Sequence, residues 1–100
     1  MQIATSSHTF NAVSGSGPQQ DRETLSFSNP VSQAVAVLNG FEVEYSNQKD
    51  HHFGRLQVDV GVEEINGTQV TVNITYGLRD WSKNWDDGYD GIVRFSVIAE

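Results

Sequence analysis

The chain contains no cysteine among its 100 residues. This absence excludes a disulfide framework, a thiolate nucleophile and a zinc ribbon, but it does not decide the compartment, because secreted proteins can also lack cysteine. Basic residues are scarce too, with six Lys and Arg against 13 Asp and Glu, for a formal net charge of −7. Because these cations are scattered along the sequence, the chain would repel a nucleic-acid backbone, and we expect no nucleic-acid partner.

Long apolar runs are also missing. The longest, residues 34–38, is far too short to cross a bilayer, so we expect no membrane insertion. The beginning of the chain has neither the basic nor the apolar region of a signal peptide, and we expect none within it. The 37% of hydrophobic residues still suffices for one folded domain with a single core.

Where the sequence is apolar, it alternates with polar residues at the period of a half-buried strand rather than of a helix. The alternating segments are residues 41–45, 56–62, 70–76 and 92–99. A short strand at 25–27 is stopped by Asn29 and Pro30, and the continuous apolar run at 34–38 suits a strand covered on both faces. About six strands without intervening helices predict an all-β fold, a six-stranded antiparallel β-sandwich.

One hairpin can be aligned from its side chains. A three-residue loop at 65–67 keeps apolar residues opposite one another and places Gly67 where a left-handed backbone is needed. The expected pairs are Val62 with Val70, Val60 with Val72, Val58 with Ile74 and Leu56 with Tyr76. The other face of both strands is polar, and we expect it to form the contacts of a homotrimer. Its residues include Gln57, Asp59, Asn73 and Thr75.

The first part of the chain differs from the rest. Residues 14–20 have the composition of a linker, and residues 9–13 suit at best an edge strand. We therefore divide the chain into an N-terminal strand and linker segment, residues 1–20, and a sandwich domain, residues 21–100. His8 lies in the first segment with no partner nearby in the sequence.

The most unusual passage is residues 80–91, which predict a loop between two strands. It holds Trp81, Trp85 and Tyr89 among four aspartates. An aromatic face stacks on the axial hydrogens of a sugar ring while carboxylates bond its hydroxyls, so this composition is typical of a carbohydrate site. The alternative is that Trp81 or Trp85 folds back to cap the sandwich.

The aspartates of this loop raise calcium as an alternative ligand. Asp86, Asp87 and Asp90 offer hard oxygen ligands on a turn that also holds two glycines. Their spacing lacks the regular alternation and terminal glutamate of an EF-hand, and Asp-Asp-Gly is common turn chemistry. We therefore expect no cofactor and no metal, with calcium as the alternative.

Catalytic patterns are missing as well. The chain has no Gly-x-Ser-x-Gly elbow, and no general base with an orienting third group can be named. His51 and His52 are adjacent in a polar loop and would point to opposite sides of an extended chain. We expect no enzyme.

Short blocks between residues 21 and 100 follow one another in an ordered pattern: residues 27–31, 36–41, 56–58, 70–72, 81–82, 89 and 93–99. In this order they resemble the H-type lectin domain, the type of snail agglutinin and of the discoidin C-terminal domain. The resemblance implies a six-stranded antiparallel β-sandwich that assembles as a trimer. It also implies that galactose or N-acetylgalactosamine binds in clefts between neighbouring subunits.

The resemblance further implies which residues contact the sugar. They are Asp21, Arg55, Gln57, Trp81, Ser82, Trp85 and Tyr89, with the strand at 56–62 contributed by a neighbouring subunit. Gln57 stands where family members with strong N-acetylgalactosamine binding have an arginine, and Arg55 can substitute because it lies on the same strand face. Trp85 occupies an apparent insertion in the loop and is expected to modify the sugar preference.

The leading hypothesis from the sequence is a non-catalytic, trimeric, carbohydrate-binding domain that recognises a glycan or glycoconjugate. A secreted or cell-surface location is favoured for such a domain. One alternative is a structural or assembly module that keeps the trimeric sandwich without a sugar site. Another is a binding domain of a larger protein, for which the linker-like residues 14–20 are the hint.

Overall fold

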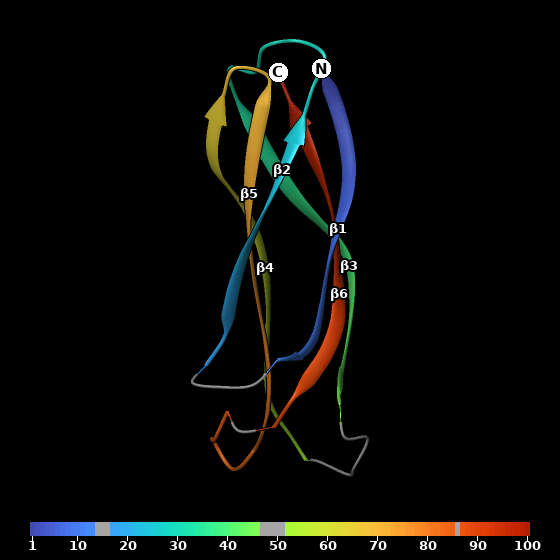
Figure 1. Cartoon of the computed structure of the whole chain (residues 1–100), viewed down its shortest axis with the longest axis vertical. Helices are drawn as coiled ribbons and strands as arrows, with labels where there is room; N and C mark the ends of the chain where they lie inside the picture. Colours follow the sequence, from blue (N-terminus) through green and yellow to red (C-terminus); the bar gives the residue numbers. More distant parts are fainter. Residues whose placement is uncertain (14–16, 47–51, 86) are drawn as a thin grey trace.

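Two antiparallel β-sheets of three strands each form the molecule (Figure 1). The computed structural model describes residues 1–13, 17–46, 52–85 and 87–100, without the side chains of residues 12 and 13. Within these residues the strands are β1 (Gln2–Val13), β2 (Gln19–Ser26), β3 (Ala34–Tyr45), β4 (Phe53–Asn66), β5 (Gln69–Asp80) and β6 (Tyr89–Ala99). One sheet has the order β1-β6-β3 and the other β2-β5-β4. The predicted six-stranded antiparallel β-sandwich is confirmed.

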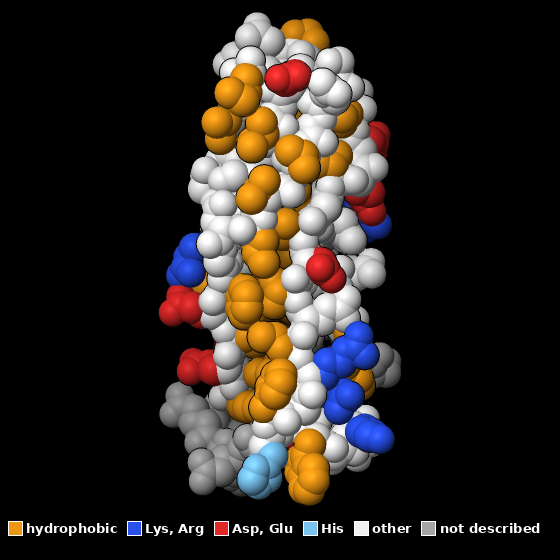
Figure 2. Space-filling view, turned by 180° about the vertical axis from the view of Figure 1, so that it is seen from behind, with side chains coloured by type: hydrophobic (Ala, Val, Ile, Leu, Met, Phe, Trp, Pro, Cys, Tyr) orange, Lys and Arg blue, Asp and Glu red, His pale blue; other side chains and the backbone are white. Residues whose placement is uncertain are grey.

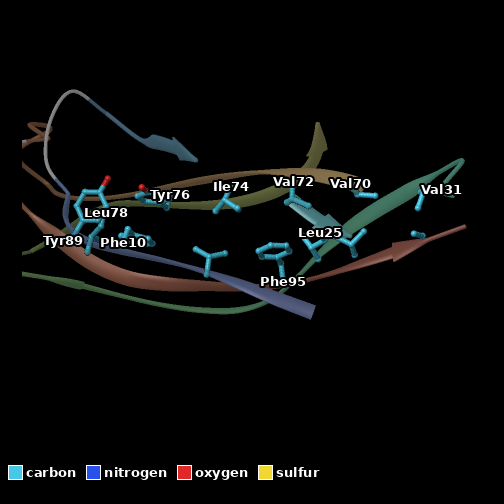
Figure 3. Packing of buried hydrophobic residues seen from close by; sticks show 13 residues of the cluster. Phe10, Leu25, Val31, Val70, Val72, Ile74, Tyr76, Leu78, Tyr89 and Phe95 are labelled. Carbon is cyan, nitrogen blue, oxygen red and sulfur yellow. The ribbon is translucent and has the colours of Figure 1, made fainter. Parts of the chain in front are cut away.

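The core lies between the two central strands, β5 and β6 (Figure 3). Alternate residues of both strands point inward and are fully buried: Val70, Val72 and Ile74 on β5, and Val93, Phe95 and Val97 on β6. At one end, the Phe10 ring of β1 stacks on the Tyr76 ring of β5 with 3.9 Å between centroids. This stack joins the two sheets. The alternation that predicts the strands also determines which side chains fill the core, because every second residue of β5 and β6 points inward.

The predicted strands at 34–38 and 41–45 are one strand, β3, with an irregularity between Leu38 and Gly40. The prediction that residues 34–38 are covered on both faces is wrong. Ala34 and Ala36 pack against the core, whereas Val35 and Val37 on the other face are 53% and 41% exposed. A sandwich has only two layers, so a single chain has nothing to cover the outer face of this sheet.

The predicted boundary near residue 20 is wrong, because the sandwich begins at β1. This strand pairs with β6 from Gln2 to Val13 and supplies Phe10, only 4% exposed, to the core. Its place at a sheet edge is as expected. Most residues on both faces of β1 are small or polar. The alternation of apolar and polar residues is therefore weak, and it did not predict the strand over its full length. Over the part of the chain described here, no helix has the length and hydropathy that a bilayer crossing requires.

The hairpin of β4 and β5 differs from the predicted pairing by two residues. Val62 lies opposite Val72 and Val60 opposite Ile74, and after an irregularity near Glu64 the strands close around a loop at 67–68. The apolar residues nevertheless share the inner face as predicted, because a shift of two residues preserves the side-chain direction. Gly67 takes the expected left-handed conformation, with φ of 63°.

Candidate functional site

An exposed group of rings lies at the end of the molecule where β4 begins and β5 ends. We call His52, Phe53 and Trp81 the aromatic tip. Trp81 is 70% exposed and Phe53 66% exposed, and the three residues line a shallow hollow. The His52 ring meets the Trp81 ring edge-on with 5.7 Å between centroids. Figure 2 shows this end of the molecule at the bottom, where hydrophobic and histidine side chains lie side by side.

Backbone contacts hold the aromatic tip together. The Trp81 N–H donates to the His52 carbonyl at 3.0 Å, which joins the chain just before β4 to the chain just after β5. Gly54 makes this approach possible, since a Cβ there would lie 2.1 Å from the Asp80 carbonyl oxygen. Only glycine therefore fits between Phe53 and the rest of β4, and it brings Phe53 opposite Asp80 across the ladder.

The turn that follows β5 presents Trp81 to solvent. The backbone N–H of Ser82 donates to Asp80 Oδ1 at 3.0 Å, and the Ser82 hydroxyl donates to the same oxygen. Such a carboxylate-capped turn stabilises the chain reversal without using the indole ring. Ser82, a predicted sugar contact, is exposed beside Trp81.

The second tryptophan of the loop packs on the protein instead. Trp85 lies against Gly77 on the outer face of β5, where a Cβ on Gly77 would be 3.0 Å from the indole ring. Pro18 lies beside the same position, and the Arg79 guanidinium is 5.7 Å from the Trp85 ring centroid. The two tryptophans thus differ in role: Trp85 folds back on the sandwich, as the alternative interpretation expected for one of them, and Trp81 does not.

Two further predicted sugar contacts, Tyr89 and Asp21, are not free to bind a ligand: Tyr89 is buried, and the Asp21 carboxylate is hydrogen-bonded within the protein. Tyr89 is 2% exposed, and its ring packs edge-on against Phe10. Burial raises the pKa of Tyr89. The predicted contact between Tyr89 and a sugar is therefore corrected, because the ring and hydroxyl of Tyr89 lie inside the core. Asp21 is also engaged elsewhere, since its carboxylate accepts hydrogen bonds from Tyr76 and His8.

We call His8, Asp21, Glu23 and Tyr76 the clasp, because they join the edge strands β1 and β2 of the two sheets. His8 Nε2 lies 2.8 Å from Asp21 Oδ2, and Nδ1 lies 2.7 Å from Glu23 Oε2. Burial lowers the pKa of His8, but the hydrogen bonds to Glu23 and Asp21 outweigh it and leave the pKa raised. The hydrogen bond from Tyr76, and then that from His8, lowers the pKa of Asp21.

The two remaining predicted contacts, Arg55 and Gln57, lie on the same outer face of β4, as expected from their spacing. Arg55 Nη2 donates to Gln57 Oε1 at 3.4 Å, and Gln57 Nε2 donates to Asp59 Oδ2 at 3.1 Å. The structure thus brings Arg55 and Gln57 together, on the strand whose first residue, Phe53, belongs to the aromatic tip.

The calcium alternative rests partly on Asp86, which lies outside the described residues. Asp87 and Asp90 are described, and both take part in interactions of their own. In the described ranges, no group of three His, Asp or Glu side chains is arranged to hold a metal ion.

Sequence reasoning missed Phe53 and His52 of the aromatic tip, and it missed the partners of His8. An apolar Phe53 between a polar loop and Gly54 was the available signal. The partners of His8 are Asp21 and Glu23 of β2, which lie 13 and 15 residues further along the chain, so no local pattern indicates them.

No family model, curated protein or solved structure matches this chain. The fold defines a class, the small antiparallel β-sandwich, and a fold class by itself does not assign a function. The function is therefore argued from the aromatic tip and its surroundings.

Proposed function

We propose that this chain is a non-catalytic carbohydrate-binding domain of H-type lectin character that recognises galactose or N-acetylgalactosamine on glycans. The observation that carries the proposal is the Trp81 ring, 70% exposed at the end of a rigid sandwich. The backbone of Trp81 is held by its N–H bond to His52 and by the turn that Asp80 caps, so the residue costs little entropy to use as a binding platform.

The chemistry around Trp81 suits a sugar. The indole offers a flat apolar face for the axial hydrogens of a pyranose, and Phe53 extends that surface. Ser82, Arg55 and Gln57 supply hydrogen-bonding groups of both kinds for the hydroxyl rim. Such a shallow site gives an affinity of about 4 to 6 kcal/mol, roughly millimolar to tens of micromolar, because each hydroxyl exchanges water for protein at little net gain.

Replacement of Trp81 by alanine is expected to weaken glycan binding by about tenfold or more, equivalent to about 1.4 kcal/mol, since stacking provides much of the contact area. Folding should change by less than about 0.5 kcal/mol, because the ring packs on the surface. A glycan array on wild type and Trp81→Ala, with thermal unfolding of both, measures the two effects.

Trp81→Phe serves as the matched control, because it keeps an aromatic face and should retain part of the binding. Binding of neutral glycans that is equal in wild type and Trp81→Ala would contradict the proposed site. A large loss of thermal stability in Trp81→Ala would show instead that the ring supports the fold.

We further propose that the domain works as a homotrimer, which raises the apparent affinity of weak sites on a glycan surface. Support comes from the side where β3 and β4 lie side by side, which we call the β3/β4 flank. Leu38 and Phe41 of β3 are 38% and 41% exposed, and Leu56 of β4 is 37% exposed. Figure 2 shows hydrophobic side chains in a line along the long axis on this side. Both strands are sheet edges, whose unpaired backbone groups also favour association.

Apolar side chains favour further copies of this chain as the occupant of the β3/β4 flank. Phe41 on β3 and Leu56 on β4 are both exposed, so the β3 side of one copy can cover the β4 side of the next. The polar face predicted from the sequence is partly withdrawn from solvent within one chain, with Thr75 8% exposed. Burying apolar surface lowers the free energy of association, whereas burying polar surface costs desolvation. We therefore place the contacts on the flank.

Sedimentation velocity at micromolar concentration is expected to give the mass of three chains for wild type and of one chain for Phe41→Glu. Ser28→Glu, in an exposed loop, is the control and should remain trimeric. A single-chain mass for wild type would overturn the assembly. A trimer that survives Phe41→Glu but dissociates on Asn73→Arg would place the contacts on the polar face.

A structural module without sugar binding is the second candidate, and the β3/β4 flank is the observation that favours it. The two experiments separate the candidates, because such a module would be trimeric and silent on the glycan array.

A further inference from the structure

Two arginines face each other beside the aromatic tip. Arg55 of β4 and Arg79 of β5 are direct partners in the antiparallel ladder, and both point to the outer face of that sheet. Their Cα atoms are then about 4.5 to 5.5 Å apart. Like charges directly opposite on neighbouring strands destabilise a sheet, so this pair is unfavourable unless an anion lies between the two guanidinium groups.

The protein itself supplies no such anion within the described residues. Arg55 donates to the Gln57 amide, and Arg79 donates to the Asp80 backbone carbonyl at 3.1 Å and lies over Trp85. The contrast with two other arginines is direct: Arg22 pairs with Glu63, and Arg94 pairs with Glu42. In a chain with a net charge of −7, two opposed arginines that have no carboxylate partner among the described residues are an unusual arrangement.

Two carboxylates near this pair on the same two strands, Asp80 and Asp59, are directed away from it or bound by other groups. Asp80 follows Arg79 on β5, so alternation turns it toward the other face, and its Oδ1 accepts two hydrogen bonds from Ser82. Asp59 shares the outer face but lies four pairs further along the ladder, where Gln57 donates to it. Figure 2 shows Lys and Arg side chains gathered beside the aromatic tip at this end. Exposed Lys83, in the turn after β5, adds a third cation.

From this arrangement we infer that the site takes an anionic sugar, with the ring on Trp81 and a sulfate or carboxylate group between Arg55 and Arg79. Guanidinium groups bind these oxyanions through paired, charge-assisted hydrogen bonds, which gives them direction as well as strength. The bound anion would also remove the repulsion between the two arginines. This inference rests on the proposed function, because the sugar ring must still be held by the aromatic tip.

The experiment compares neutral, 6-sulfated and sialylated galactosides on one array at 50 and 300 mM salt, for wild type and three variants. Wild type is expected to bind at least one anionic class about tenfold better than the neutral sugar at low salt, and the advantage should shrink at high salt. Arg79→Gln should lose that advantage and keep neutral binding, because Arg79 is not among the groups proposed for the hydroxyl rim. The sulfated and sialylated spots show whether sulfate or carboxylate is preferred.

Arg94→Gln is the matched control, because it removes an exposed arginine from the other sheet and should keep the anionic preference. Arg55→Gln repeats the test from the facing strand, with circular dichroism to verify the fold. It should also lose the anionic advantage, and its neutral binding should weaken because Arg55 serves the hydroxyl rim as well. Neutral binding without an anionic advantage, or an advantage that survives both Arg55→Gln and Arg79→Gln, would overturn this inference while the proposed function stands. Absence of binding to every sugar would overturn both.

Discussion

Replacement of Phe95 by alanine is expected to destabilise the domain by about 3 to 5 kcal/mol. Phe95 is 0% exposed at the centre of β6, between Ser6 of β1 and Leu38 of β3 in the sheet. Ser6 is too small to fill the space of the ring, and Leu38 lies on an edge strand with 38% of its surface exposed. The facing sheet is held by its own ladder, so a cavity would remain. Since small domains are stable by only about 5 to 15 kcal/mol, much of the total would be lost.

Urea unfolding followed by circular dichroism measures the loss, and the melting temperature should fall by about 12 °C or more. The neighbouring Ser96→Ala is the control. Its hydroxyl points outward and bonds Thr5 and Asn39 at an exposed position, so its loss should cost about 1 kcal/mol or less. A Phe95→Ala variant as stable as Ser96→Ala would mean that the ring is not part of the core.

Replacement of His8 by alanine is expected to cost about 2 kcal/mol near pH 6, because two hydrogen bonds to carboxylates are lost in a partly solvated setting. The His8 side chain is 15% exposed and links β1 to β2, where the inward-facing Asp21 and Glu23 would otherwise be left together. The variant therefore loses attraction and gains repulsion between the carboxylates.

The pH dependence of this loss follows from the two pKa shifts. The raised pKa of His8 means that its contribution is complete below the unfolded value of about 6.5 and is lost as pH rises through the folded value. The lowered pKa of Asp21 means that its contribution is present above about 3.9 and is lost as pH falls through the folded value. The clasp should therefore stabilise the domain most between about pH 4 and 6.5.

Unfolding of wild type and His8→Ala from pH 4 to 9 tests this dependence, with the difference in unfolding free energy expected to shrink toward pH 9. His52→Ala, the other described histidine, should show little change in stability because its ring lies on the surface. A difference between wild type and His8→Ala that stays constant over this range would exclude protonation of His8 as the cause.

The candidate site was only partly predictable from the sequence. The composition of the loop after residue 80 indicated aromatic and polar groups together, but it did not separate the exposed Trp81 from Trp85, which packs on Gly77. Tyr89 has the same composition signal and lies in the core. Whether a ring in a loop turns outward depends on whether another strand offers space for it, and that space exists only in the folded chain.

The sequence by itself determined the class of the fold and the sides of its strands. Alternation in β4, β5 and β6 has one consistent apolar face, and any register that differs by two residues keeps that face inside. For this reason the sandwich was predicted correctly although the pairing of the hairpin was not.

Only the tertiary structure decided which distant residues meet. The clasp joins His8 of β1 to β2 in the other sheet. Arg55 and Arg79 face each other because of the β4–β5 register, which the sequence predicted with an error of two residues. In the predicted register these arginines would not have been partners. Contacts between strands are set by the packing of two whole sheets, and the free energy of that packing is a sum over many residues that no local pattern contains.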